Sequence, residues 1–167
     1  MKKLFLLILL VIISVTGYTQ ESEPREAPYK RFNSIPPFKL LLTDSSTYFT
    51  KEDLSRKSSV MLMLFSPDCE HCQHEMEQIV QNIKAFDKTQ IILATNREFK
   101  DMLRFYNQYD LARFKNIVVG QDVNYIFPVF FDVRNLPFLA FYNRKKELVS
   151  VFEGAMPIEK MIAEIKK

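Results

Sequence analysis

An uninterrupted apolar run, Val-Met-Leu-Met-Leu-Phe at positions 60–65, constrains the fold more than any other feature of the sequence. Two serines precede it and Ser-Pro-Asp follows it, so turn-forming residues bound the run on both sides. A strand that is buried on both faces is continuously apolar, whereas a half-exposed strand alternates apolar and polar residues. Because parallel sheets are covered on both faces, the run predicts an inner strand of such a sheet.

The segments around this run alternate between strand and helix patterns. Short apolar runs predict further strands at 38–42, 48–50, 91–94, 117–119, 138–142 and 148–152. Apolar residues at helical spacing predict helices at 76–86, 99–109, 124–131 and 157–165. We expect the third helix to break near Pro128. The order predicts an α/β fold of three layers, a mixed central sheet flanked by helices, with an N-terminal hairpin extension formed by the first two strands.

The ends of the chain differ in character. Residues 1–19 combine a basic start, an aliphatic run at 4–15 and small residues after it, which is the pattern of a secretory signal peptide. About a dozen apolar residues are too few to span a bilayer comfortably, so a permanent N-terminal membrane anchor is the alternative. Residues 20–33 are polar and predict a tether. Residues 34–167 are then one domain.

Composition excludes several classes of function. Outside residues 1–19 the chain has 21 basic and 20 acidic side chains, a balance that does not indicate a nucleic-acid partner. Only Gly120 and Gly154 remain there, so a glycine-rich phosphate-binding loop is excluded. The only cysteines are Cys69 and Cys72. A disulfide between them would close too short a loop to stabilise a fold, so we expect the pair to serve chemistry.

Cys69 and Cys72 follow the buried strand and precede the first helical stripe. Cys69 is expected at the start of that helix, where unpaired backbone N–H groups favour a thiolate. Cys72 follows one turn later on the same face, within disulfide reach but more enclosed. An accessible nucleophile with a resolving thiol behind it is the arrangement of a Cys-x-x-Cys redox pair. An inert local disulfide is the alternative. The Cys69–Cys72 disulfide would be redox-active, and no other cofactor is expected.

The Cys-Glu-His-Cys motif and the order of the elements resemble the thioredoxin fold. The leader and the segment Ser-Ile-Pro-Pro-Phe-Lys-Leu at 34–40 resemble envelope-located thiol–disulfide oxidoreductases of the TlpA/ResA type. This resemblance covers residues 34–167. It implies that Pro137 is a cis-proline facing the cysteines. It also implies that Glu75, three residues after Cys72, is the acid that many members carry at this place.

The sequence departs from thioredoxins at two places near the pair. Asp68 replaces the tryptophan before the first cysteine and is the expected helix N-cap. Met63 replaces the buried aspartate six residues before that cysteine, so Glu75 is the candidate for its proton-handling role. His71 stands where the oxidising DsbA family has histidine, and it would stabilise the Cys69 thiolate unless it is merely an exposed residue. His71 thus favours an oxidant, whereas the TlpA/ResA resemblance favours a reductant. The direction of electron flow therefore stays open.

The sequence therefore predicts an exported, monomeric thiol–disulfide oxidoreductase of the bacterial periplasm or cell envelope, soluble after signal cleavage. Its partners would be thiols and disulfides of envelope proteins and a membrane thiol donor or acceptor. One alternative is a Cu(I) site formed by the thiolates of Cys69 and Cys72. His71 and His74 lie on another face of the helix and would not join these two ligands. The other is a thiol peroxidase, which rests on the shared fold and on Ser66 three residues before Cys69.

Overall fold

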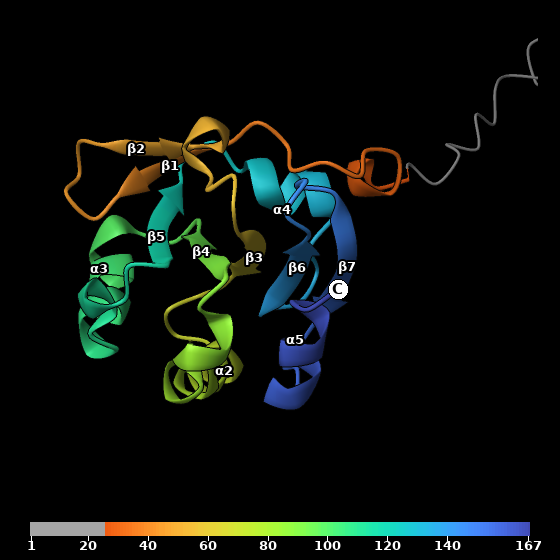
Figure 1. Cartoon of the computed structure of the whole chain (residues 1–167). Coiled ribbons are helices and arrows are strands. Elements are labelled where there is room, and N and C mark those ends of the chain that lie inside the picture. The colour runs from red at the N-terminus through yellow and green to blue at the C-terminus, as the bar shows by residue number, and fades with distance from the viewer. Residues whose placement is uncertain (1–25) are drawn as a thin grey trace, which may run out of the picture.

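A seven-stranded mixed sheet runs through the centre of the structure, a computed structural model that describes residues 26–167 (Figure 1). The strands are β1 (Lys39–Leu42), β2 (Tyr48–Thr50), β3 (Ser59–Leu64), β4 (Thr89–Thr95), β5 (Ile117–Asp122), β6 (Phe138–Tyr142) and β7 (Leu148–Glu153). They lie in the order β2-β1-β5-β4-β3-β6-β7. β4 pairs in parallel with β3 and β5, and the remaining pairs are antiparallel. The predicted mixed sheet and N-terminal hairpin are confirmed.

β3 lies inside this sheet, between β4 and β6, and all six of its residues are buried. Successive side chains of a strand point to opposite faces. Met61 and Met63 therefore join one core cluster, and Val60, Leu62 and Leu64 join the other. The continuous apolar run is explained by helices that cover both faces.

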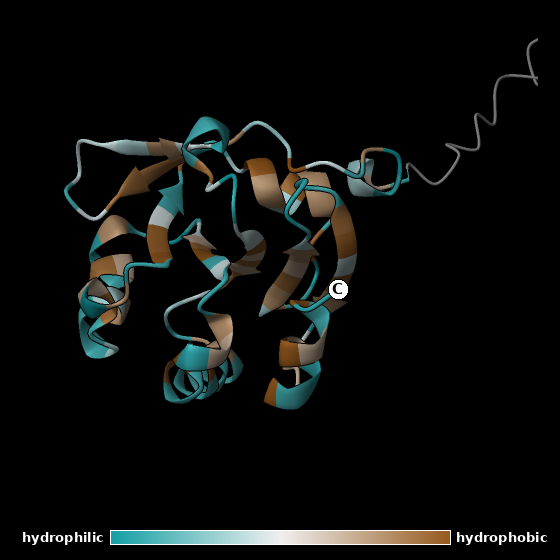
Figure 2. Cartoon of the chain, in the orientation of Figure 1, coloured by the Kyte–Doolittle hydropathy of each residue, from teal (hydrophilic) through white to brown (hydrophobic). Residues whose placement is uncertain are grey.

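Helices α2 (Glu70–Gln81), α3 (Phe99–Gln108) and α5 (Ile158–Glu164) cover one face of the sheet, and α4 (Ile126–Phe131) covers the other (Figure 1). Figure 2 shows apolar residues concentrated on the strands and hydrophilic residues on the turns and along α2. The predicted three layers are thus confirmed. α2 ends at Gln81, earlier than predicted, because residues Ile83–Phe86 form a separate 3-10 turn after it.

The prediction that the helix at 124–131 breaks near Pro128 is wrong. Pro128 is the third residue of α4, and the N–H groups of a helix's first turn have no intrahelical partner. A proline there costs no hydrogen bond. The first two N–H groups of α4, from Ile126 and Phe127, donate to the buried carboxylate of Asp122 at 3.2 and 2.9 Å. Asp122 ends β5, which extends three residues beyond the predicted strand.

Part of the predicted tether, at residues 27–30, packs on the domain. Residues Pro28–Lys30 form a 3-10 turn, Ala27 is buried, and the ring of Tyr29 lies 5.7 Å from that of Phe131. The predicted signal peptide and residues 20–25 lie outside the described residues. Within residues 26–167, no helix has the length and hydropathy needed to cross a bilayer.

Candidate active site

The turn between β3 and α2 positions Cys69 at the carboxyl edge of the sheet. β3 ends at Leu64, and α2 begins at Glu70. Cys69 is the N-cap residue of α2, and its Sγ accepts a hydrogen bond from the backbone N–H of Cys72 at 3.2 Å. An N-cap side chain normally accepts from a first-turn N–H group, and here sulfur takes that role. The helix start therefore places its unpaired donors against the half-buried Cys69 sulfur.

The prediction that Asp68 caps α2 is wrong. Asp68 precedes the N-cap by one residue, and its carboxylate instead lies 2.6 Å from a terminal nitrogen of Arg104 on α3. The same guanidinium lies 3.0 Å from Asp101. Asp68 and Arg104 are both mostly exposed, so their ion pair contributes about 1 kcal/mol or less to stability. Its consequence is positional, because it links the residue before Cys69 to the neighbouring helix.

Cys72 lies one turn inside α2 and is fully buried in the core cluster beneath α2, α3 and α5. Burial raises the pKa of the Cys72 thiol above its ordinary value, and the neighbouring Cys69 sulfur and Glu75 carboxyl raise it further. Cys72 therefore keeps its proton at neutral pH unless a nearby base removes it. Of the two thiols, only Cys69 is accessible to a large partner.

Glu75 is buried one turn beyond Cys72, with 1 % of its surface exposed. Its carboxylate accepts a hydrogen bond at 3.0 Å from the backbone N–H of Met156, in the segment between β7 and α5. Burial raises the pKa of Glu75, and the Met156 hydrogen bond and the charge of His74 oppose that rise only in part. A buried carboxyl group with a raised pKa, on the helix that carries both thiols, is a candidate proton acceptor for the buried thiol.

The residue before Pro137 lies against the first cysteine, at the start of the neighbouring strand β6. The Leu136–Pro137 peptide bond is cis, as the resemblance implied, and it immediately precedes β6. β6 pairs with β3 in a register that sets Phe138 opposite Leu64, so the start of β6 meets the end of β3. The Cys69 sulfur consequently lies 3.9 Å from the carbonyl oxygen of Leu136.

His71 is exposed on α2 and makes no hydrogen bond or ion pair with other residues of the described range 26–167. His74 is also exposed, on the same helix. Among residues 26–167 no group of three or more histidine, cysteine or acidic side chains is arranged to hold a metal ion. The structure therefore places Glu75 close enough to affect the Cys72 thiol and places the Leu136–Pro137 peptide beside Cys69, whereas the His71 side chain has no hydrogen bond to either sulfur.

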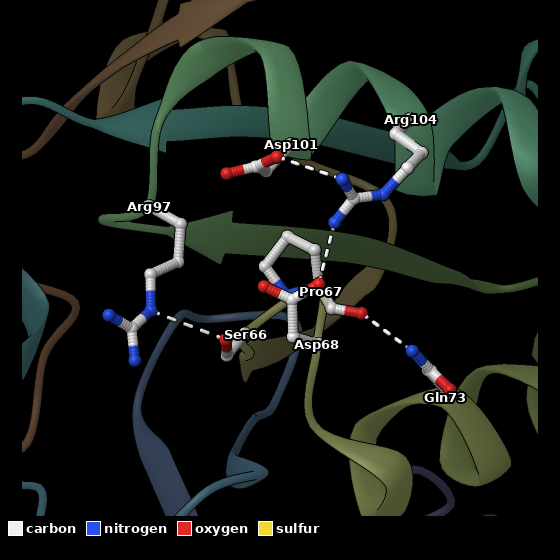
Figure 3. Close-up of polar contacts among 7 residues, drawn as sticks. All are labelled: Ser66, Pro67, Asp68, Gln73, Arg97, Asp101 and Arg104. Carbon is white, nitrogen blue, oxygen red and sulfur yellow. Dashed lines mark hydrogen bonds and ion pairs between the residues drawn. The ribbon is translucent and has the colours of Figure 1, made fainter.

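Three polar residues around the Cys69 loop were not identified from the sequence (Figure 3). The Nε of Arg97 donates to the Ser66 hydroxyl at 3.2 Å, the Gln73 amide donates to the Pro67 carbonyl at 2.7 Å, and Arg104 pairs with Asp68. Arg97 follows β4, and Arg104 lies on α3. Their place beside Cys69 depends on the pairing of β3 with β4, which no local sequence pattern specifies.

An open groove of about 660 Å³ runs along Cys69. Its lining consists of Ser66, Asp68, Cys69, Arg97, Glu98, Asp101, Arg134, Asn135 and Leu136. A second groove of about 330 Å³ shares Arg97, Arg134 and Leu136 with the first. A larger hollow of about 730 Å³ includes Ser59 and Thr89, which begin β3 and β4, and neither cysteine lines it. The chemistry of the cysteines therefore belongs to the first groove, which Cys69 lines and which the second groove adjoins.

Comparisons with known proteins identify the fold. No protein-family model and no curated protein sequence matches the chain. Among similar solved structures, a secreted disulfide oxidoreductase of Mycobacterium tuberculosis, homologous to Escherichia coli DsbE, has 19 % identity and a TM-score of 0.64, covering 77 % of this chain and 94 % of its own.

Two further structures give the same result. An exposed lipoprotein thioredoxin of Streptococcus pneumoniae has 20 % identity and a TM-score of 0.61, covering 78 % of this chain and 98 % of its own. A thioredoxin-family thiol:disulfide interchange protein of Chlorobium tepidum has 13 % identity and a TM-score of 0.67, covering 80 % of this chain and 94 % of its own. At these identities the likeness establishes the thioredoxin-like fold, as the sequence predicted.

Proposed function

We propose that this thioredoxin-fold chain is an exported thiol–disulfide oxidoreductase that reduces disulfides in proteins of the bacterial cell envelope. The observation that carries the proposal is the unequal pair: a half-buried Cys69 at the helix N-cap and a fully buried Cys72 one turn behind it. An attacking thiol must be accessible, whereas a resolving thiol needs only to reach the first sulfur. The secreted disulfide oxidoreductase of Mycobacterium tuberculosis is a precedent for this chemistry on the same fold.

The exchange has two steps. The Cys69 thiolate attacks one sulfur of a partner disulfide, so a Cys69–partner disulfide forms and the other partner sulfur leaves as a thiolate. Cys72, after losing its proton, attacks the Cys69 sulfur, which forms the Cys69–Cys72 disulfide and releases the second partner thiolate. The two protons from Cys69 and Cys72 balance the two partner thiolates. The partner is reduced by two electrons, and the cysteine pair is oxidised by two.

Glu75 and Pro137 support these steps in different ways. Glu75 is the proposed proton acceptor for Cys72, since it is a buried carboxyl group one turn beyond the resolving thiol and its charge acts on that thiol. Pro137 has no backbone N–H, so the start of β6 offers the Leu136 carbonyl to a bound partner without a competing donor at the next residue. His71 is exposed, and its side chain has no hydrogen bond or ion pair within residues 26–167, so the proposal gives it no role in the exchange.

The proposed electron source is a membrane thiol donor that returns the Cys69–Cys72 disulfide to two thiols. Export rests on the leader at residues 1–19, and the mass of the mature N-terminus tests it: a chain that begins near residue 20 supports export, and an intact Met1 favours a membrane anchor. No cofactor other than the cysteine pair enters the proposal.

Titration of the protein in glutathione redox buffers tests this function. Peptide mapping should detect a Cys69–Cys72 disulfide whose fraction follows a two-electron equilibrium. A reductant should have a potential near the ~−270 mV of thioredoxin, and an oxidant one near the ~−120 mV of DsbA. We expect the lower value. A potential near that of DsbA would reverse the proposed direction, and failure to form the disulfide would contradict the function.

A further inference from the structure

Arg97 differs from the other charged residues that line the Cys69 groove because it has no ion-pair partner of opposite charge within residues 26–167. Within residues 26–167, Glu98 pairs with Lys100 at 2.9 Å, and Asp68 and Asp101 both pair with Arg104. Arg134, the other cation of the two grooves, lies 3.0 Å from Asp132. Every carboxylate that lines the Cys69 groove therefore has a cationic partner, whereas the side chain of Arg97 bonds to a neutral hydroxyl.

Arg97 is also held in place. Its Nε donates to the Ser66 hydroxyl at 3.2 Å, its backbone N–H donates to the Thr95 hydroxyl at 3.2 Å, and its carbonyl accepts from the Gln121 amide at 2.8 Å. Ser66 is buried and lies three residues before Cys69. Figure 3 shows the two terminal nitrogens of Arg97 pointing away from Ser66. The guanidinium is thus anchored by Nε, and its two terminal nitrogens, with four N–H donors, remain for another molecule.

The two grooves meet at Arg97, which lines both of them. The second groove contains one carboxylate, that of Asp122, which is buried and accepts N–H groups from Ile126 and Phe127 at the start of α4. It therefore cannot turn toward Arg97 without leaving those donors unpaired. A planar guanidinium with two free terminal nitrogens matches the geometry of a carboxylate.

We propose that Arg97 selects polypeptide partners that carry a carboxylate side chain beside the disulfide that Cys69 attacks. This inference rests on the proposed function, because it concerns the partner of the same reaction. Binding of the carboxylate by Arg97 holds the partner's cysteine next to the Cys69 sulfur, which lies in the same groove. Arg97 is then a specificity-determining residue, and the exchange chemistry stays with the two cysteines.

Three model peptides test the proposal. Each contains one disulfide, and the residue beside one cysteine is Glu, Gln or Lys. The rate of reduction by the reduced protein is divided by the rate with dithiothreitol, which removes intrinsic differences in disulfide reactivity. We expect the normalised rate for the Glu peptide to exceed that for the Gln peptide about fivefold at low salt, and the ratio to fall toward one at 0.5 M salt.

Charge-changing variants locate the effect. Arg97→Gln should bring the Glu-to-Gln ratio to about one, and Arg97→Glu should prefer the Lys peptide. The matched control is Arg144→Gln, since Arg144 is exposed in the β6–β7 turn, away from both grooves, and it should keep the wild-type ratio. A wild-type ratio of one, or a ratio that Arg97→Gln leaves unchanged, would overturn the inference.

Two further outcomes distinguish failure of this inference from failure of the proposed function, and a polypeptide partner from a small disulfide. If the wild-type protein reduces none of the peptides, the proposed function fails rather than the role of Arg97. Oxidised glutathione is a small disulfide that carries its own carboxylates. If Arg97→Gln slows reduction of oxidised glutathione but leaves the peptide ratio unchanged, the carboxylate belongs to a small thiol, and the assignment to polypeptides is overturned.

Discussion

The two thiols of the Cys-x-x-Cys motif differ because of one helical turn. Cys69 takes the N-cap, where its sulfur meets a backbone N–H group, and Cys72 enters the core, where burial raises the pKa of its thiol. The same helix then brings Glu75 into the core one turn later. A single helix thus supplies the accessible sulfur, the buried sulfur and a buried carboxyl group in succession.

The buried carboxyl of Glu75 gives stability a specific pH dependence. Its pKa is raised above the ordinary 4.5, so between the unfolded and the folded pKa the native state binds more protons than the unfolded state. The contribution of Glu75 to the free energy of unfolding of the reduced protein therefore falls as pH rises through this window. Glu75→Gln removes the ionisation while keeping an acceptor for the Met156 N–H.

We expect the stability of Glu75→Gln relative to wild type to increase from pH 4 to pH 8, by on the order of 1 kcal/mol for each unit by which the pKa is raised. Urea unfolding at several pH values measures this difference. Glu70→Gln is the matched control, because Glu70 is an exposed carboxylate on the same helix. Parallel pH profiles for Glu75→Gln and wild type would contradict a buried, proton-binding carboxyl.

At the scale of elements, β1 of the N-terminal hairpin pairs with β5, and the two strands approach unusually closely at one position. A Cβ atom built on Gly120 of β5 would lie 2.7 Å from the Cβ of Leu40 in β1, so the two strands approach more closely than a side chain allows. Leu40 is fully buried beneath α4. The absence of a side chain at Gly120 is therefore a condition for the pairing of β1 with β5.

Gly120→Ala should destabilise the protein by about 1–3 kcal/mol, the usual cost of overpacking. It should also speed amide hydrogen exchange in β1 and β2, since the hairpin must shift away from β5. Gly154→Ala is the contrasting variant: its Cβ would meet no atom within 4 Å, but its φ of +93° disfavours a side chain. That variant should lose stability without faster exchange in the hairpin. Equal exchange in both variants would refute the close-contact explanation.

At the scale of the whole molecule, local sequence patterns predicted the features that depend on residues close together in the sequence. The apolar run at 60–65 was sufficient for β3, and the cysteine spacing was sufficient for a sulfur pair on one helix. The cis bond at Pro137 followed from the resemblance to the thioredoxin fold. The helix N-cap was misassigned by one residue, because aspartate is usually the better cap and sulfur took its place.

The remaining features depend on how distant segments meet. Arg97 and Arg104 reach the Cys69 loop only because β4 and α3 lie beside β3 and α2 in the folded sheet. Tyr29 lies in a polar segment, yet its ring packs against that of Phe131, which is distant in the sequence. No periodicity in the sequence specifies such contacts. The site's chemistry was therefore predictable, whereas the charges that surround it were not.

The division of roles between the two cysteines is the central claim, and trapping of mixed disulfides tests it most directly. Cys72→Ser leaves the accessible attacking thiol and removes the resolving thiol, whereas Cys69→Ser leaves only a buried thiol. Each reduced variant is mixed with a disulfide peptide, and intact-mass spectrometry counts the adducts. Cys72→Ser should accumulate a stable Cys69–peptide disulfide, and Cys69→Ser should accumulate almost none. Equal trapping by both variants, or trapping through Cys72 alone, would contradict the account.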